Sequence, residues 1–473
     1  MNALSLGSES PSGIVTRVFG RSPHRFCPGR SRPIARVTLT AALLLVGTTG
    51  GAPAQTPDTT PAQTTTTTTV APDAAAALTP STYVGDALGF IERYAYRVPR
   101  VDWPAIRARA EAKAAVARTI TDAYPVITEA VKALGDRHSS FTKPVDATVQ
   151  TQGNFNGFGF LASMPSRVVV TVAPGGPATR AGLQVGDRID RVNGQMPKTT
   201  GNALAIRNAD GSPAETAVLK VVRRGVKRAL TITLRRGTVT LVSVPVSQPP
   251  PRVVIPAELA YLDVPGIVGD AVAQRAFATQ VQTIIRELDT GTRCGWIVDL
   301  RRNRGGYIYA LLAGLGPLLG EGLVGGSRDS RGEVTTWTYR AGALYAGSES
   351  TVSVESPYVL RRPGAPVAVL TGGLTASAGE ASVISFRTLP NARSFGEPTI
   401  GLTTFNVRKT LADGAFLDIT AAVDVDRAGT PYEGPISPDE PVVIDWAAIN
   451  NGNDAVVKAA SSWLRSQPAC TLP

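Results

Sequence analysis

The stretch that most constrains this chain is residues 371–380, TGGLTASAGE, which follows the short apolar run at residues 367–370. Small apolar residues that end in Gly-Gly predict a buried strand and a tight turn, and the sequence after them predicts the first turn of a helix. Ser377 is therefore expected at a strand-to-helix junction, where helix N–H groups favour negative charge. This position suits a serine nucleophile. It also suits a serine that caps the helix, which is the commoner role for this residue type.

The first 54 residues have the pattern of an export signal. They are rich in arginine, contain an apolar run at residues 37–46, and end in Ala52-Pro53-Ala54, a small-x-small cleavage pattern. We therefore expect a signal peptide over residues 1–54 and an exported protein, periplasmic or extracellular. The apolar run is shorter than the roughly 20 residues that a spanning helix needs, so no stable membrane span is expected after signal removal.

Charge and cysteine content narrow the possible partners. Residues 1–54 hold six arginines and one glutamate, so their removal lowers the formal net charge from +11 to +6. The remainder has no Lys/Arg cluster with interleaved aromatic residues, and no nucleic-acid partner is expected. Of three cysteines, Cys27 lies in the predicted signal. Cys294 and Cys470 remain, and the sequence leaves open whether they form a disulfide.

Residues 55–80 predict a disordered linker, because they are rich in Thr and Pro and contain almost nothing to bury. Apolar residues at helical spacing then predict an N-terminal helical domain at residues 81–150. His138 follows the last strong helical pattern of this segment. Since His24 lies in the predicted signal, His138 is the only imidazole expected in the mature chain. A surface or capping histidine is the alternative role.

Residues 151–237 form a separate unit with a glycine-rich loop and several short strands. The order of these features resembles a PDZ domain. The resemblance implies that the loop's backbone N–H groups bind a peptide's terminal carboxylate while the peptide adds as a strand to the sheet edge. The loop residues are Gly157, Phe158, Gly159 and Phe160. A PDZ module that acts only as a spacer or lid is the alternative.

Residues 238–473 are predicted to form the main α/β domain. The expected strands are 259–264, 294–300 and 366–370, and the expected helices are 271–288, 307–319 and 380–388. The sequence DLRRNRGG, residues 299–306, stands between the second strand and its helix. Backbone N–H groups of Gly305 and Gly306 are candidates to hold the oxyanion of an acyl-transfer reaction, although Gly-Gly before a helix is by itself only a turn.

Taken in order, the helical unit, the PDZ-like unit, DLRRNRGG, TASAGE and GEPTIGLTT (residues 396–404) resemble the S41 family of serine peptidases over roughly residues 80–450. The resemblance implies a crotonase-like α/β core with an inserted PDZ domain, and it carries the family's nucleophile onto Ser377. In the C-terminal-processing branch a lysine base follows the pattern Gly-Glu-x-Thr-x-Gly. Here that position is Leu402, and Lys409 lies seven positions further on.

A second branch, similar to tricorn core peptidases and the nisin-resistance protease, uses a histidine in an Asp-x-His-Thr/Ser-Ser-Phe motif. Residues 136–141, DRHSSF, match this motif and carry the base onto His138. The resemblance therefore implies a Ser–His pair whose members lie 239 residues apart in the sequence. Such a pair works without a metal or other cofactor, because the imidazole takes the serine proton and later returns it to the leaving amine.

The remaining roles follow from the same chemistry. The N–H of Ala378 and one from Gly305 or Gly306 are expected to hold the oxyanion. The resemblance also implies a carboxylate that orients the imidazole and a serine just before the histidine. Arg137 stands in the serine's place. Glu433 is the candidate carboxylate. Glu380 is the alternative, with a first-turn helix acid as its other role.

These patterns predict an exported serine endopeptidase that cleaves peptides or unfolded protein tails, with the PDZ domain binding substrate C-termini or gating the site. The alternative is a catalytically inactive protein that binds peptides or hydrophobic ligands on the same fold. A scaffold that works through PDZ contacts is a third possibility. The natural substrate, the cleavage preference and the oligomeric state cannot be inferred from the sequence.

Overall fold

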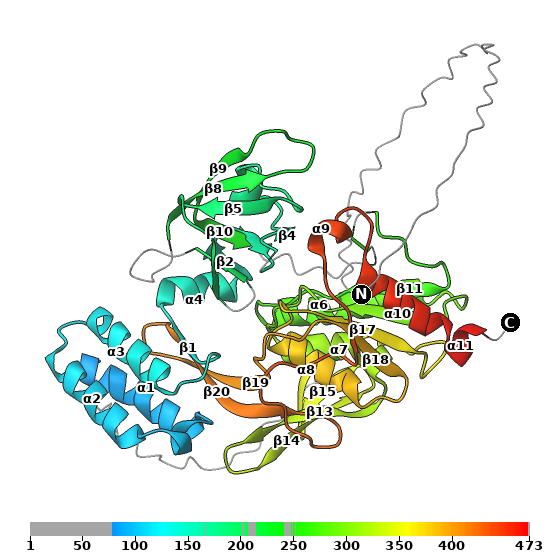
Figure 1. Cartoon of the computed structure of the whole chain (residues 1–473). Helices are drawn as coiled ribbons and strands as arrows, with labels where there is room; N and C mark the ends of the chain where they lie inside the picture. Colours follow the sequence, from blue (N-terminus) through cyan, green and yellow to red (C-terminus); the bar gives the residue numbers. More distant parts are fainter. Residues whose placement is uncertain are drawn as a thin grey trace, which may run out of the picture. The chain divides into compact units, whose positions relative to one another are not determined.

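A computed structural model describes residues 78–164, 166–200, 203–206, 214–240, 247, 249–250 and 252–471 of the chain (Figure 1). The predicted signal peptide and almost all of the predicted linker lie outside the described residues, as do His24 and Cys27. Within the described ranges, no helix is long and apolar enough to cross a membrane.

Helices open the described part of the chain, as the apolar spacing predicts. They are α1 (Pro80–Tyr94), α2 (Trp103–Val116), α3 (Ile120–Ala133) and α4 (Pro144–Thr151), with a short 3-10 helix at Val98–Arg100. Each of the first three helices begins at a polar N-cap residue. The side chains of Thr79, Asp102 and Thr119 each accept a hydrogen bond from a backbone N–H of the following turn. Their buried faces share one apolar cluster with Leu417 and Ile419 of a later strand.

The PDZ-like unit is built from short antiparallel strands. A hairpin joins β3 (Phe160–Ala162) and β4 (Val169–Val172), and a three-stranded sheet joins β5 (Arg188–Val192), β8 (Thr216–Val222) and β9 (Leu230–Arg235). Two further pairs are β2 (Asn154–Gly157) with β10 (Gly237–Thr240), and β6 (Lys198–Thr200) with β7 (Ala203–Ala205). The one-turn helix α5 (Pro177–Arg180) follows β4. These elements confirm the several short strands that the sequence predicts for this unit.

A parallel sheet forms the centre of the main domain. Its order is β11 (Leu259–Asp263), β12 (Gly295–Asp299), β17 (Val367–Thr371), β18 (Ala392–Gly396) and β21 (Glu440–Pro441). Every residue of β11, β12 and β17 is buried. A sheet buried on both faces needs continuous apolar strands, which is the pattern that predicted these three strands from sequence.

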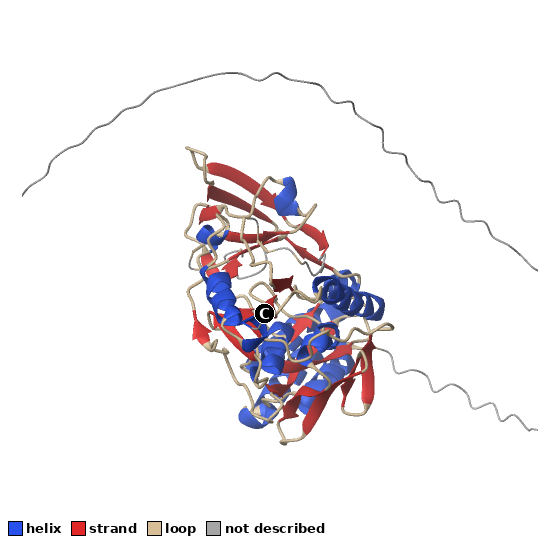
Figure 2. Ribbon diagram, turned by 90° about the vertical axis from the view of Figure 1, so that its right-hand side faces the viewer, coloured by secondary structure: helices blue, strands red, loops and turns tan. Residues whose placement is uncertain are grey.

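Helices cover both faces of this sheet (Figure 2). Alternate strand residues such as Leu262 and Val298 pack with α6 (Ala271–Leu288), α7 (Ile308–Leu319) and α8 (Ala378–Arg387). The opposite face, including Ile297 and Leu370, packs with α9 (Trp446–Ile449) and α10 (Ala455–Arg465). The three predicted helices of this domain are confirmed to within two residues.

A second, antiparallel sheet was not predicted. Its order is β1 (Ser140–Thr142), β20 (Phe416–Val425), β13 (Gly322–Asp329), β14 (Val334–Arg340), β15 (Ala343–Ala346) and β16 (Glu349–Ser353), with β19 (Thr404–Thr410) also paired to β20. Ser140 of β1 and Arg408 of β19 both stand opposite Asp418 of β20. The sheet therefore brings the segment after His138 beside the segment that begins at Thr404.

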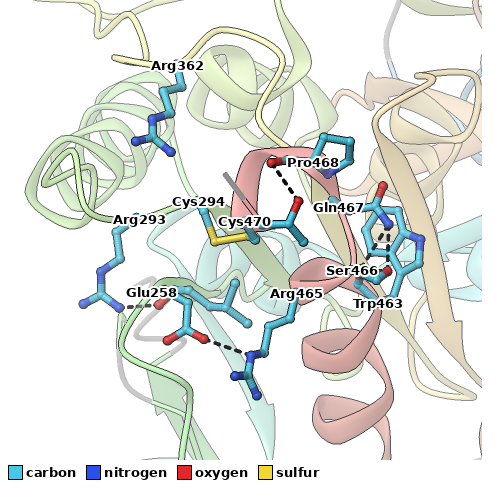
Figure 3. Close-up of a disulfide and its surroundings, with 12 residues drawn as sticks. Glu258, Arg293, Cys294, Arg362, Trp463, Arg465, Ser466, Gln467, Pro468 and Cys470 are labelled. Carbon is cyan, nitrogen blue, oxygen red and sulfur yellow. Dashed lines mark hydrogen bonds and ion pairs between the residues drawn. A yellow bond between two sulfur atoms is a disulfide. The ribbon is translucent and has the colours of Figure 1, made fainter. Parts of the chain in front are cut away.

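A disulfide joins Cys294, directly before β12, to Cys470 in α11 (Pro468–Thr471), with their Cα atoms 5.0 Å apart (Figure 3). The structure thus answers whether Cys294 and Cys470 form a disulfide, which the sequence left open. The bond closes a loop with a sequence separation of 176 residues. Arg465 of the preceding helix also pairs with Glu258, at 3.0 Å, beside the start of β11.

Replacing both cysteines, in a Cys294→Ser/Cys470→Ser variant, should lower the free energy of unfolding by about 2–5 kcal/mol, because the unfolded chain regains the freedom of a long loop. Urea unfolding of the oxidised wild type, the reduced wild type and the variant measures this. The reduced wild type should match the variant. An unchanged midpoint in both would show that the bond contributes nothing to stability.

Candidate active site

Ser377 lies where the sequence predicts, at the N-cap position of α8 and six residues after the end of β17. Its backbone angles, φ 53° and ψ −123°, are uncommon for any residue other than glycine. Such strain persists only where the surrounding structure imposes it, and it clusters at functional sites. The Ser377 side chain is half-buried.

The DLRRNRGG turn packs directly on this serine. A Cβ atom on Gly305 would lie 2.6 Å from Ser377 Cβ and 3.0 Å from the nitrogen of Ala378, so this position admits no side chain. A Cβ on Gly306 would lie 1.8 Å from the carbonyl oxygen of Ile267. Both glycines also have positive φ, 91° and 119°. The Gly-Gly pair is therefore required by close backbone approach to the serine and to the segment around Ile267.

Two backbone N–H groups near Ser377 remain available to an oxyanion. Ala378 is the first residue of α8, and the first N–H groups of a helix have no partner within it. Gly305 donates its N–H to Asn303 Oδ1, at 2.8 Å. No acceptor for the N–H of Gly306 is found in the part of the chain that the structure describes. Of the two candidate glycines, Gly306 is thus better able to supply the second donor.

A buried ion cluster holds the turn in place. Arg301 is fully buried and its guanidinium contacts Asp299, at 2.6 Å, and Asp454, at 2.8 Å. Tyr261 donates a further hydrogen bond to Asp299, at 2.7 Å. Although burial opposes ionisation, Arg301 holds the pKa of Asp299 below its usual value, so the cluster is ionic. Asn303 is also fully buried and donates to the carbonyl of Val264, at 3.0 Å.

His138 is fixed by contacts on both its backbone and its ring. Asp136 Oδ1 accepts hydrogen bonds from the N–H groups of His138, at 2.9 Å, and Ser139, at 2.6 Å. Asn406 donates to the carbonyl of His138, at 3.1 Å. The ring nitrogen Nδ1 lies 2.7 Å from Thr404 Oγ1. If Nδ1 carries the proton in this pair, Nε2 is left unprotonated and can accept one.

Burial lowers the pKa of the His138 imidazole below its ordinary value, and the nearby carboxylates of Asp136 and Asp418 oppose this shift. A lowered pKa keeps the ring neutral at pH 7. Neutral imidazole is the form that acts as a general base.

Glu380 connects the serine to the segment that holds the histidine. One carboxylate oxygen, Oε2, accepts from the N–H groups of Ser377, at 2.9 Å, and Leu402, at 2.7 Å. The other, Oε1, accepts from the Gly401 N–H, at 2.7 Å, and the Thr399 hydroxyl. Thr404, which contacts His138, lies two residues after Leu402. The carboxylate therefore links the backbone at Ser377 to the segment that leads to Thr404, the hydrogen-bond partner of the His138 ring.

Within the described residues, no hydrogen bond joins the Ser377 hydroxyl to the imidazole of His138. Neither candidate carboxylate contacts that imidazole. Glu380 contacts backbone, as above. Glu433 is half-exposed, accepts a hydrogen bond from Tyr96, at 3.2 Å, and pairs with Arg100, at 3.6 Å. The observed partner of the ring is Thr404, which sequence reasoning did not single out although it ends the GEPTIGLTT segment.

The lysine alternative has no support in the geometry. Lys409 forms an ion pair with Asp86 of α1, at 2.9 Å, and its ammonium lies over the ring of Phe90. Leu402, which occupies the lysine position of the other branch, contributes only its backbone N–H to the Glu380 network. His138 is therefore the base candidate that the site contains.

The predicted PDZ loop spans the end of β2 and the start of β3. The carbonyl oxygens of Phe158 and Gly159 accept hydrogen bonds from backbone N–H groups after β4, at 2.9 and 2.7 Å. Gly157 ends β2, and Phe160 begins β3. Among the described strands β3 pairs with β4 alone.

Comparison with known families matches residues 258–442 to peptidase family S41 and residues 168–223 to the PDZ domain. The nisin-resistance protein of Lactococcus lactis subsp. lactis is 29% identical over 218 residues, 46% of this chain and 63% of that protein. The chloroplastic carboxyl-terminal-processing peptidase 2 of Arabidopsis thaliana is 26% identical over 343 residues, 68% of this chain and 61% of that protein. The chain thus spans slightly less than two thirds of each of these relatives.

Two solved structures share the fold. A lipoprotein from Streptococcus agalactiae matches with a TM-score of 0.52 at 20% identity, over 82% of this chain and 97% of that one. The photosystem II D1 C-terminal processing protease matches with a TM-score of 0.51 at 19% identity, over 83% and 99%. At this identity the likeness shows a mixed α/β architecture with N-terminal helices and a PDZ domain.

The pKa of His138 should lie below ~6.5, and Asp418→Asn should lower it further, because a negative charge that favours the imidazolium is removed. NMR titration of the full chain labelled with ¹³C-histidine measures both values, and His24→Gln assigns the second signal. A pKa that is unchanged or raised in the Asp418 variant would contradict the assigned electrostatics.

Proposed function

Because residues 258–442 belong to peptidase family S41 and residues 168–223 form a PDZ domain, we propose that the protein is an exported serine endopeptidase. It hydrolyses peptides or unfolded protein tails, with Ser377 as the nucleophile and His138 as the base. The observation that carries this proposal is the Glu380 network, which ties the strained serine to the segment whose Thr404 contacts the imidazole. Export rests on the sequence pattern of residues 1–54.

The architecture in this proposal is a crotonase-like core at residues 238–473, with a helical domain at 81–150 and a PDZ domain at 151–237. It is supported by the buried parallel sheet with helices on both faces and by the pairing of β2 with β10. The edge of β3 that pairs with no described strand is the proposed place where a substrate C-terminus binds, with Gly157, Phe158, Gly159 and Phe160 around its carboxylate.

In the proposed reaction, Nε2 of His138 removes the hydroxyl proton of Ser377 while the serine oxygen forms a bond to the peptide carbonyl carbon. The imidazolium then gives that proton to the amine that leaves as the C–N bond breaks. Water, deprotonated by the same imidazole, hydrolyses the acyl-serine and restores the free enzyme.

The N–H groups of Ala378 and Gly306 hold the oxyanion that develops in each step. The close approach of Gly305 to Ser377 and of Gly306 to Ile267 supports this assignment, because it fixes the backbone of the turn beside the serine. A donor of this kind contributes about 2.7–4 kcal/mol to stabilising the transition state.

Thr404 takes the place of the orienting carboxylate in this mechanism. A hydroxyl fixes the tautomer of the ring, but, being neutral, it stabilises an imidazolium less than a carboxylate does. The carboxylates of Asp136 and Asp418, whose charges favour the protonated ring, supply the electrostatic stabilisation of the imidazolium that Thr404 lacks. Glu380 is a positioning residue that acts through backbone N–H groups, and Glu433 fastens the segment around it to Tyr96 and Arg100.

The alternative is a protein that binds peptides or apolar ligands without turnover. It is favoured by one observation, the lack of a hydrogen bond between the serine hydroxyl and the imidazole among the described residues. Resting enzymes commonly hold such pairs at longer distance and close them on binding substrate. Chemical labelling separates the two functions.

A serine-directed fluorophosphonate should label the wild type, while Ser377→Ala and His138→Ala should lose both labelling and roughly 10⁴-fold or more in the hydrolysis of an unfolded protein substrate. Lys409→Ala is the matched control, because it removes the lysine that the site does not use, and it should label normally. A folded wild type that binds peptide but takes no label would establish the alternative function.

Removing the Thr404 hydroxyl in Thr404→Val should lower kcat by roughly tenfold or more and leave KM nearly unchanged, because the imidazole loses its orienting hydrogen bond. Thr404→Ser keeps the hydroxyl and should retain most of the activity. Steady-state kinetics of the three proteins test this. Equal kcat in the Val and Ser variants would show that the contact has no role in the reaction.

A further inference from the structure

The turn that packs on Ser377 contains three arginines, and they differ in their partners. Arg301 pairs with Asp299 and Asp454, and Arg302 pairs with Asp263. No carboxylate and no hydrogen-bond acceptor is found for Arg304 within the described ranges. Nothing in the fold near this turn therefore explains why a third cation is present at Arg304.

Arg304 stands next to the proposed reaction centre. It is one peptide unit, about 3.8 Å between Cα atoms, from Gly305, which contacts Ser377. The Arg304 side chain is exposed to solvent, yet desolvation by neighbouring protein atoms lowers the pKa of its guanidinium. The guanidinium of Arg304 can therefore be reached from solvent, next to the turn that packs on Ser377.

A second arginine lies on the histidine side. Arg137 directly precedes His138, is exposed, and donates one hydrogen bond to the carbonyl of Ile400, at 3.1 Å. It too has no carboxylate partner in the described part of the chain. Arg408, which also lies near the site, is different, because Asp418 binds it through two hydrogen bonds of 2.7 and 3.0 Å.

The acids around the site are already engaged. Asp136 accepts three hydrogen bonds within its own turn, Asp418 binds Arg408, and Glu380 accepts four hydrogen bonds. None of these carboxylates pairs with Arg304 or Arg137 within the described residues. An arginine fork matches the geometry of a carboxylate and can bind it with two parallel hydrogen bonds.

Resting on the proposed peptidase function, we propose that Arg304, assisted by Arg137, binds a carboxylate of the substrate peptide close to the bond that is cleaved. Two sources share this chemistry: the side chain of an Asp or Glu residue, and the free C-terminus of the peptide. The site would thereby favour acidic segments or bonds near a chain end over neutral internal segments.

The test uses a peptide that the wild-type full chain cleaves, found by digesting an unfolded protein. Each variant of this peptide carries a single Glu at one of the three positions on either side of the cleaved bond. For every Glu peptide there is a matched Gln peptide, and each peptide is made with a free and with an amidated C-terminus. The wild type should show about tenfold higher kcat/KM for the carboxylate member of one pair. Which pair shows the effect identifies the source.

The preference should vanish in Arg304→Gln, mainly through a higher KM, while neutral peptides are cleaved within about twofold of the wild-type rate. Arg304→Lys keeps the charge without the fork and should retain part of the preference. The matched control is Arg331→Gln, which changes an exposed arginine on the β13–β14 hairpin. This variant should keep the full preference for the carboxylate peptide. A preference that survives in Arg304→Gln, or no preference in the wild type, overturns the proposal and leaves the peptidase function standing.

Measurements of peptide binding test the carboxylate site independently of the hydrolysis reaction. Fluorescence anisotropy on the full-length Ser377→Ala protein needs no turnover. It uses the same peptides or, if the wild type cleaves none, Glu/Gln-matched peptides taken from the same unfolded protein. There Arg304→Gln should weaken the binding of the carboxylate peptide about tenfold and of its neutral partner little. If no peptide is hydrolysed but this difference is seen, the carboxylate site stands and the peptidase function fails. Equal binding of both peptides overturns the site.

Discussion

The carboxylate of Glu380 is the interaction on which the rest of the site depends. It is fully buried, and burial raises its pKa, which four hydrogen-bond donors oppose. A buried carboxylate is tolerated only when its oxygens are satisfied in this way. Its donors come from the turn that holds Ser377 and from residues 399–402, so the charge can be satisfied only when these two segments meet. The cost of burying it therefore enforces the geometry of the site.

The antiparallel sheet completes what Glu380 begins. β20 has β1 on one side and β19 on part of its other side, so the segment after His138 and the segment after Leu402 are aligned on the same strand. The N-terminal helices share an apolar cluster with β20, which fastens the histidine segment to the core. His138, which follows the helical unit, is thus aligned with the core that holds the proposed nucleophile Ser377 at the N-cap of α8.

Much of the fold could be predicted from the sequence where a strand or a helix is formed by a continuous run of buried residues. β17 and α8 follow from an apolar run and a Gly-Gly turn, and α6 has the bounds that its periodicity indicates. The antiparallel strands carry buried polar residues, among them Ser327, Thr420 and Asp424, so their alternation is obscured. The choice between Gly305 and Gly306 depends on where the Asn303 side chain lies, and the role of Thr404 depends on a contact across 266 residues. Neither has a local signal in the sequence.

The distance along the chain between the two proposed catalytic residues, His138 and Ser377, determines when their site can form. During synthesis the imidazole is made 239 residues before the hydroxyl, and the threonine that orients it is made later than both. If the proposed mechanism holds, an incomplete chain has no working centre, and neither has a complete one before its sheets are assembled. In the proposed mechanism the site is therefore absent from nascent and unfolded chains.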